Sequence, residues 1–208
     1  PISWRSERVI ADRLLSFAEA EHISRIMLLQ AAEQTLSPER KAEYLDGASD
    51  EARHTRIFLQ QAQRIRSQFG ESPPFAPQGD AGNLFADLGE ARFLALLHHG
   101  EARVMAQFMI YRDFFARRKK TKLARAFAII VEEEAGHQGK AWQMLLEVSE
   151  SRKDAVHDLR WVQRWELRRS FRRLAQRNSA FISKFLMLLL YPLGPRGISP
   201  QKSCTQCT

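Results

Sequence analysis

Apolar residues recur at intervals of three and four along most of this chain, which is the period of a helix buried on one side. The pattern predicts five helices: about residues 5–35, 37–69, 84–117, a fourth from the basic turn at 118–120 to about 150, and a fifth over about 154–177. Ser37 and Pro38 are predicted to begin the second helix as its N-cap and first residue. Most glycines and prolines fall within 70–82 and 192–200, so little interrupts the helical pattern elsewhere. These features predict an all-α fold.

The lengths of the connections predict how the helices are arranged. Short links after the first and third helices predict two antiparallel hairpins. The longer segment 70–82 can cross the length of a bundle, at up to about 3.3 Å per residue. The prediction is a four-helix bundle over 1–150, with a basic amphipathic helix at 151–178 packed on it and an apolar, then flexible, tail at 179–208.

Each of the four apolar stripes carries acidic or histidine residues at one level only. These residues are Glu21 on the first helix, Glu51 and His54 on the second, Glu101 on the third, and Glu134 and His137 on the fourth. A carboxylate in a helical core is costly unless it is paired or bound to metal. Each of these residues lies about 15–18 positions from the turn of its own hairpin, or about 22–27 Å at 1.5 Å per residue. We therefore expect all six to meet in one layer.

The spacing within this set indicates a site for two metal ions. Residues three apart share a helix face, so Glu51 and His54 point inward together, as do Glu134 and His137. A Glu from each of two helices and Glu-x-x-His from each of the other two is the ligand pattern of di-iron and di-manganese carboxylate proteins. Four carboxylates are neutralised by two divalent cations, and mixed oxygen and nitrogen ligands suit iron or manganese better than zinc. The expected cofactor is two iron ions, with manganese as the alternative.

Neighbouring residues compete for some of these places. On the first helix, Glu19 is the alternative to Glu21, which the helical phase favours. On the fourth, Glu133 could pair with a histidine four residues later. The spacing seen on the second helix favours Glu134, and Glu132 and Glu133 are then expected on a solvated face.

Other polar residues on the helices receive plainer interpretations. Glu90 lies about 16 Å from Glu101 along the third helix and is expected at the surface or the end of the bundle. His98 could support the metal layer, but an ordinary hydrogen-bonded histidine is the favoured interpretation. His22, His99 and His157 are interpreted in the same way.

Three segments of the chain resemble the ferritin-like di-iron superfamily across about residues 10–148. They are EHISRI at 21–26, EARHTRIF at 51–58 and EEEAGH at 132–137. They look most like the demethoxyubiquinone hydroxylase and tRNA-hydroxylase branch, and rubrerythrins are similar at the same positions. The resemblance implies a ferritin-like four-helix bundle and two irons that react with O2 or peroxide. It implies terminal ligands at Glu21, Glu101 and both histidines, and bridging carboxylates at Glu51 and Glu134.

The two cysteines mark a departure from the rubrerythrins. Those proteins carry two Cys-x-x-Cys pairs in an added domain, whereas this chain has only Cys204 and Cys207. One pair cannot form a four-thiolate iron site within one chain, and we expect it to lie in a disordered tail. With no disulfide framework and no secretory signal, a cytoplasmic location is expected.

The net charge of +8 is concentrated in the fifth helix. Residues 160–177 contain seven arginines and one acidic residue, so this stretch contributes +6. Trp161, Trp165 and Phe171 lie among the arginines, and an apolar run follows at 181–193, too short to span a bilayer. A solvated helix on the outside of the bundle is one interpretation. Peripheral membrane contact through residues 160–193, or cover for an apolar substrate, is the other, and it is favoured over nucleic acid because no recognition motif is present.

Three functions follow as hypotheses. The first is an oxygenase that activates O2 to hydroxylate or oxidise an apolar organic substrate, with electrons from an external donor protein. The second is a peroxidase or ferroxidase with no organic substrate. The third is a bundle in which the charged layer forms only buried ion pairs. A large apolar cavity at the metal layer would favour the first over the second.

Overall fold

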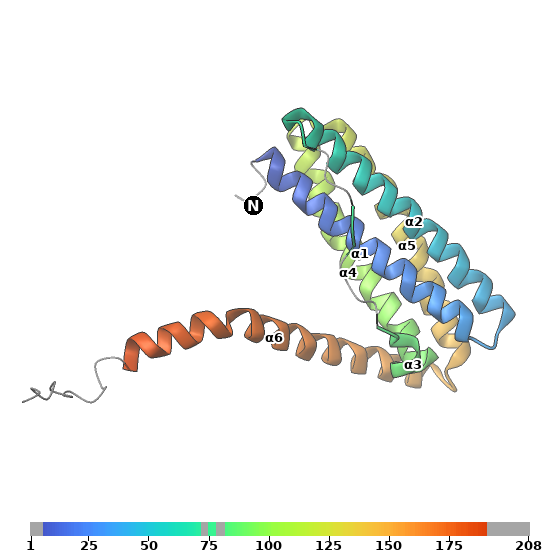
Figure 1. Ribbon diagram of the computed structural model, residues 1–208. Helices are drawn as coiled ribbons and strands as arrows, with labels where there is room; N and C mark the ends of the chain where they lie inside the picture. The colour runs from blue at the N-terminus through green and yellow to red at the C-terminus, as the bar shows by residue number, and fades with distance from the viewer. Residues whose placement is uncertain (1–5, 72–74, 78–81, 191–208) are drawn as a thin grey trace, which may run out of the picture. The chain divides into compact units, whose positions relative to one another are not determined.

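The computed structural model describes residues 6–71, 75–77 and 82–190, with side chains as far as Arg172. Every regular element in these ranges is a helix, which confirms the all-α prediction. The order is α1 (Glu7–Gln34), α2 (Pro38–Arg66), a 3₁₀ turn η2 (Ser67–Phe69), α3 (Leu84–Leu88), α4 (Glu90–Arg117), α5 (Thr121–Val148) and α6 (Arg152–Leu190). The long helices α1, α2, α4 and α5 lie alongside one another (Figure 1).

The first hairpin forms where the sequence predicts it. Ser37 caps α2: its Oγ accepts a hydrogen bond from the Arg40 backbone N–H at 3.2 Å, and Pro38 occupies the first helical position. At the opposite end of the hairpin, Arg66 near the end of α2 forms an ion pair with Asp12 near the start of α1. The two helices are therefore antiparallel.

The second hairpin runs beside the first. Glu90, at the start of α4, pairs with Arg40 at 2.8 Å and accepts a hydrogen bond from Thr35 at 2.7 Å, so α4 begins at the α1–α2 turn. Lys120, between α4 and α5, pairs with Glu7 at the opposite end of the bundle. The end of α2 and the start of α4 therefore lie at opposite ends of the bundle. Between them, Phe75 packs edge-on against His22 of α1.

Two helix boundaries differ from the prediction. The third helix was expected to be continuous over 84–117, but Gly89 separates α3 from α4 with φ of 76° and ψ of 159°, a conformation that favours glycine. The fifth helix was expected to end near residue 177, but α6 continues to Leu190 because no glycine or proline interrupts the following apolar residues.

The core contains a cluster of phenylalanines on one side of the acidic layer. Phe58, one turn after His54, packs 5.4 Å from the ring centres of Phe108 and Phe127, and Phe17 lies 5.4 Å from Phe58. Such tilted and edge-on contacts are favourable for aromatic rings. This half of the bundle is closely packed.

The described chain divides into two compact units, residues 1–163 and 164–208. In the first unit, the opening turns of α6 pack on α4: Arg92 pairs with Asp158 at 3.1 Å and lies over the ring of Trp161. In the second unit, Leu167 and Phe171 are exposed on α6. No helix among the described residues has both the length and the apolar character to cross a membrane. Cys204 and Cys207 lie outside the described residues.

Candidate metal centre

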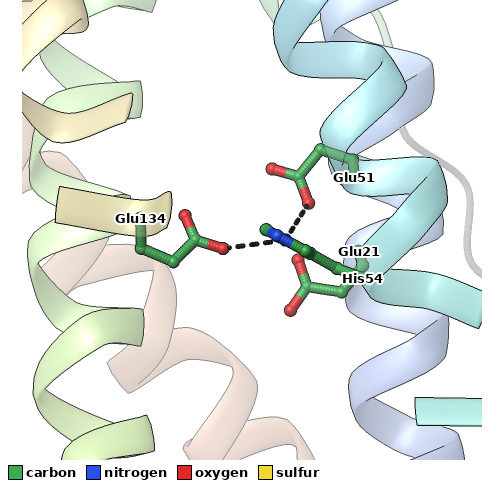
Figure 2. Close-up of side chains that lie close together, drawn as sticks. All are labelled: Glu21, Glu51, His54 and Glu134. Atoms are coloured by element: carbon green, nitrogen blue, oxygen red, sulfur yellow. Dashed lines mark ion pairs between the residues drawn. The ribbon is translucent and has the colours of Figure 1, made fainter. Parts of the chain in front are cut away.

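Four of the predicted ligands converge in the middle of the bundle. Glu21 from α1, Glu51 and His54 from α2, and Glu134 from α5 offer ligand atoms that all lie within 4.8 Å of one another. All four side chains are buried, with at most 6% of each residue exposed. Figure 2 shows Glu134 reaching across from α5 toward the side chains that α1 and α2 contribute. This buried group could hold a metal ion.

Helical periodicity accounts for the inward direction of the α2 ligands. Ala48, Glu51, Thr55 and Phe58 are all buried at intervals of three and four, so the charged pair occupies the stripe that is otherwise apolar. Ser24 of α1 donates a hydrogen bond to Glu51 Oε1 at 3.2 Å, which holds that carboxylate in place. Sequence reasoning did not identify Ser24, which lies three residues after Glu21 on the same helix face.

The other two predicted ligands border this group. His137 Nδ1 lies 3.4 Å from Glu134 Oε2, and its ring centre lies 6.1 Å from that of His54. Glu101 is half-buried and close enough to Glu134 for the two negative charges to repel. The structure therefore brings four of the six predicted residues into one buried group, with Glu101 and His137 at its border.

Both histidines turn the same ring atom toward the carboxylates. His54 Nδ1 lies 3.1 Å from Glu134 Oε1 and 3.6 Å from Glu51 Oε2. The outer nitrogens face a second pair of acids: His54 Nε2 lies 2.7 Å from Glu133, and His137 Nε2 lies 2.9 Å from Asp50. A carboxylate that accepts the outer N–H leaves the inner nitrogen free to bind metal and fixes the ring.

A single arginine joins these two outer acids. Arg53 lies 2.8 Å from Asp50 Oδ1 and 2.9 Å from Glu133 Oε1. The expectation that Glu133 lies on a solvated face was wrong, because α2 and α5 approach closely enough for Glu133 to reach His54 and Arg53. A repeated pattern in the sequence could have indicated this layer, since an acidic residue directly precedes the Glu of both Glu-x-x-His motifs.

The remaining alternatives are resolved by position. Glu19 is only half-buried and lies outside the buried group, so the structure favours Glu21. Glu132 is exposed. Glu90 lies at the end of the bundle, as expected. His98 Nδ1 lies 3.0 Å from the backbone carbonyl of Gln138, which is the ordinary hydrogen-bonded role that the sequence favoured.

Burial and repulsion between neighbouring charges raise the pKa values of two carboxyl groups of the layer, Glu21 and Glu101. Burial, together with the nearby charge of Glu51, raises the pKa of Glu21 well above its ordinary value. Burial and the charge of Glu134 do the same to the pKa of Glu101. Burial would also raise the pKa of Glu134, but its contacts with His137 and His54 outweigh burial and lower that pKa below its ordinary value.

The histidines are shifted toward their charged form when no metal is bound. Burial alone would lower the pKa of His54, but Glu134 and Glu51 outweigh it and raise the pKa to about 10. Glu134 and Asp50 likewise outweigh burial and raise the pKa of His137 to about 9. Protons thus occupy the place where a cation would bind.

The unsatisfied polar atoms fit a metal site. Within the described part of the chain, five buried side-chain atoms have no hydrogen-bond partner: Gln30 Oε1, and four atoms of the buried group, which are Glu51 Oε2, His54 Nδ1 and both carboxylate oxygens of Glu134. Buried polar atoms without partners are rare because each costs about 1–3 kcal/mol. The four atoms of the buried group are all of kinds that bind cations, and each of the three residues offers one ligand atom within 4.8 Å of the others. The donor set therefore fits a metal ion.

Comparison with known proteins adds no family to this picture. No protein-family model, no curated protein and no solved structure matches the chain. The chain is thus characterised by its own features: it is an all-helical protein with a buried glutamate–histidine group that could hold a metal ion.

Proposed function

We propose that this chain is a ferritin-like iron protein that binds two metal ions through Glu21, Glu51, His54, Glu101, Glu134 and His137 and reacts with O2 or peroxide. The observation that carries the proposal is the meeting of buried carboxylates from α1, α2 and α5 in one group, with both histidine Nδ1 atoms facing Glu134 of that group. Oxygen and imidazole ligands suit iron and manganese. Bound as Fe2+, two ions would supply two electrons, which with two protons reduce one H2O2 to two water molecules.

The space beside the layer supports a small oxidant. A hollow of about 30 Å3 touches Glu51, Glu101 and His137. A space of about 10–15 Å3 is enough to hold one water molecule, so the hollow admits O2 or hydrogen peroxide. A pocket for an organic ligand encloses about 300–1,000 Å3. This volume favours peroxide reduction or Fe2+ oxidation over hydroxylation of an organic substrate. The hydroxylase remains the second candidate because Leu28 and Leu97 give the hollow an apolar wall.

Metal content and oxidant consumption test the proposal together. Protein from iron-replete cells is expected to carry two metal ions per chain and to consume peroxide under reducing conditions. Glu134→Ala is expected to lose both properties. Glu132→Ala, two positions earlier on the exposed side of α5, is the matched control and should retain them. Far less than two metal ions in the unaltered chain, or equal peroxide consumption in both variants, would refute the proposal.

We also propose an anionic membrane surface as a partner of α6. Leu167 and Phe171 lie one turn apart with 58% and 63% of their surface exposed. Arg164, Arg168 and Arg172 are exposed on the same helix. Exposed apolar side chains among arginines suit the boundary between anionic headgroups and acyl chains.

A further inference from the structure

The hollow beside the metal layer is bounded by all four long helices. It begins at Glu51, Glu101 and His137 and extends toward the α1–α2 turn. Beyond the ligands its wall combines four apolar residues, which are Leu28 of α1, Leu97 of α4, and Ala141 and Met144 of α5, with Glu43, Tyr44, Gly47 and Lys140. On the other side of the layer the phenylalanine cluster is closely packed. The hollow is therefore a space from which a small molecule could reach the ligands directly.

A second space lies on the surface next to it. This outer groove has a volume of about 170 Å3 and runs between α2 and α5. Glu43, Lys140 and Met144 line both spaces, so these three side chains form the partition between hollow and groove. Lys140 Nζ lies 3.0 Å from Glu43 and 2.9 Å from Asp46, which draws its side chain across from α5 to α2.

The partition is suited to repeated opening. Lys140, Glu43 and Asp46 are 42–62% exposed, and exposed ion pairs contribute little free energy. Met144 is flexible, with three rotatable bonds. Movement of these side chains alone would connect the groove to the hollow, because they are the residues that line both spaces.

Gly47 sets the width of the hollow next to Glu51. A Cβ atom added at Gly47 would lie 3.3 Å from Leu28 Cδ1, which is tight, because nine in ten real Cβ contacts are longer. A Cβ added at Gly100, Gly136 or Gly139 would meet nothing within 4 Å. Among these glycines of the long helices, Gly47 is thus the one where an added Cβ would meet a side chain of a neighbouring helix.

We propose that the small oxidant reaches the metal layer from the outer groove through this hollow, that Lys140 closes its outer end, and that Gly47 limits its width. The inference rests on the proposed function and adds the route and the size limit of the oxidant. A hydrogen peroxide molecule passes; an alkyl hydroperoxide is expected to be held back at Gly47 and Lys140.

Dissolved O2 gives a test that needs no metal. O2 is paramagnetic and speeds the NMR relaxation of methyl groups that it touches. In the full-length metal-free chain, the methyl groups of Leu28 and Met144 are expected to relax faster under O2 than those of Leu14, which is buried on the other side of the layer. Gly47→Ala should reduce the effect at Leu28, which lines only the hollow, to the level of Leu14, and should leave it unchanged at Met144, which also lines the outer groove. Gly139→Ala is the matched control, because both changes add a helix-favouring methyl and only one points inward.

Peroxide kinetics test the same route in the iron-loaded chain. Gly47→Ala is expected to slow oxidation by H2O2 about tenfold, which corresponds to a barrier higher by about 1.4 kcal/mol, with unchanged iron content. Leu28→Ala in the same chain should restore the rate by removing the atom that the new Cβ meets. Lys140→Ala should speed oxidation by tert-butyl hydroperoxide more than oxidation by H2O2.

The two experiments separate failure of the route from failure of the proposed function. A wild-type chain that binds no iron or ignores peroxide would refute the proposed function, and with it the route. Iron-dependent peroxide consumption that is the same in wild type, Gly47→Ala and Lys140→Ala would overturn the route alone. So would equal O2 relaxation at Leu28 and Leu14 in the metal-free chain.

Discussion

Removing metal is expected to reverse the sign of the pH dependence of stability. Without metal, the native chain keeps protons on His54 and His137, whose pKa values are raised to about 10 and 9. In the unfolded chain both have a pKa near 6.5. The native state therefore binds more protons than the unfolded state above pH 6.5. This stabilisation is complete below that pH and is lost as the pH rises toward 9 and 10.

The size of this change in the free energy of unfolding follows from the pKa shifts of His54 and His137. Each pKa unit corresponds to about 1.36 kcal/mol, and between pH 6 and 8 the two histidines together lose about 4 kcal/mol of stabilisation. Glu21 and Glu101 act in the same direction, because their raised pKa values also mean extra protons in the native state.

Bound metal changes the direction because it displaces these protons. The unfolded histidines still take up protons below pH 6.5, while the metal-bound native histidines cannot. Stability should then rise by about 1.5 kcal/mol from pH 6 to 8 at constant free metal. The slope of the free energy of unfolding against pH reports the difference in bound protons between the unfolded and the native state. The slopes with and without metal should therefore differ by about two protons, one from each histidine.

Urea denaturation followed by circular dichroism measures both slopes. One series contains a chelator and the other an excess of Mn2+, which avoids oxidation. His137→Gln should remove about half of the metal-free slope. His98→Gln is the control, because His98 contacts a backbone carbonyl outside the centre. Slopes of the same sign with and without metal would show that the histidines and the metal do not share one site.

Three further predictions concern other parts of the molecule. Arg53→Ala should weaken metal binding about 10–100-fold in a chelator competition, whereas Arg56→Ala on the exposed side of α2 should not, and equal losses would contradict the bridging role. Glu90→Gln should lower the free energy of unfolding by about 1–3 kcal/mol, against little change for the exposed Glu33→Gln. The full chain should sediment with phosphatidylserine vesicles at low salt and less so after Phe171→Ser; no sedimentation at all would exclude the membrane partner.

The sequence predicted the buried glutamate–histidine group well because the relevant information is local. A Glu and a His three residues apart share a helix face wherever the helix lies, and the distance to a short turn fixes their height in the bundle. Glu51 and Glu134 could therefore be placed at one level before any contact was known. The choice of Glu21 over Glu19 followed in the same way, from the phase of the α1 stripe.

Features that depend on contact between helices were harder to foresee. The pairing of Glu133 with His54 needs the sideways register of α2 and α5, which periodicity does not give. Gly89 was visible in the sequence, but a single glycine is tolerated in many helices, and the break depends on how α3 and α4 pack. The volume of the hollow depends on the rotamers of several side chains at once, so no sequence pattern indicated it.

The two Glu-x-x-His motifs, at 51–54 in α2 and 134–137 in α5, differ at one position, and this difference decides how the two histidines are held. Each contains an acid, a Glu and, three residues later, a His, and each outer acid serves the histidine of the other helix. The position before the histidine is Arg53 in α2 and Gly136 in α5. Arg53 therefore holds both Asp50 and Glu133. Gly136 has no side chain that could hold them in its place. Because both rings are fixed through this single side chain, a change at Arg53 should loosen both halves of the centre together.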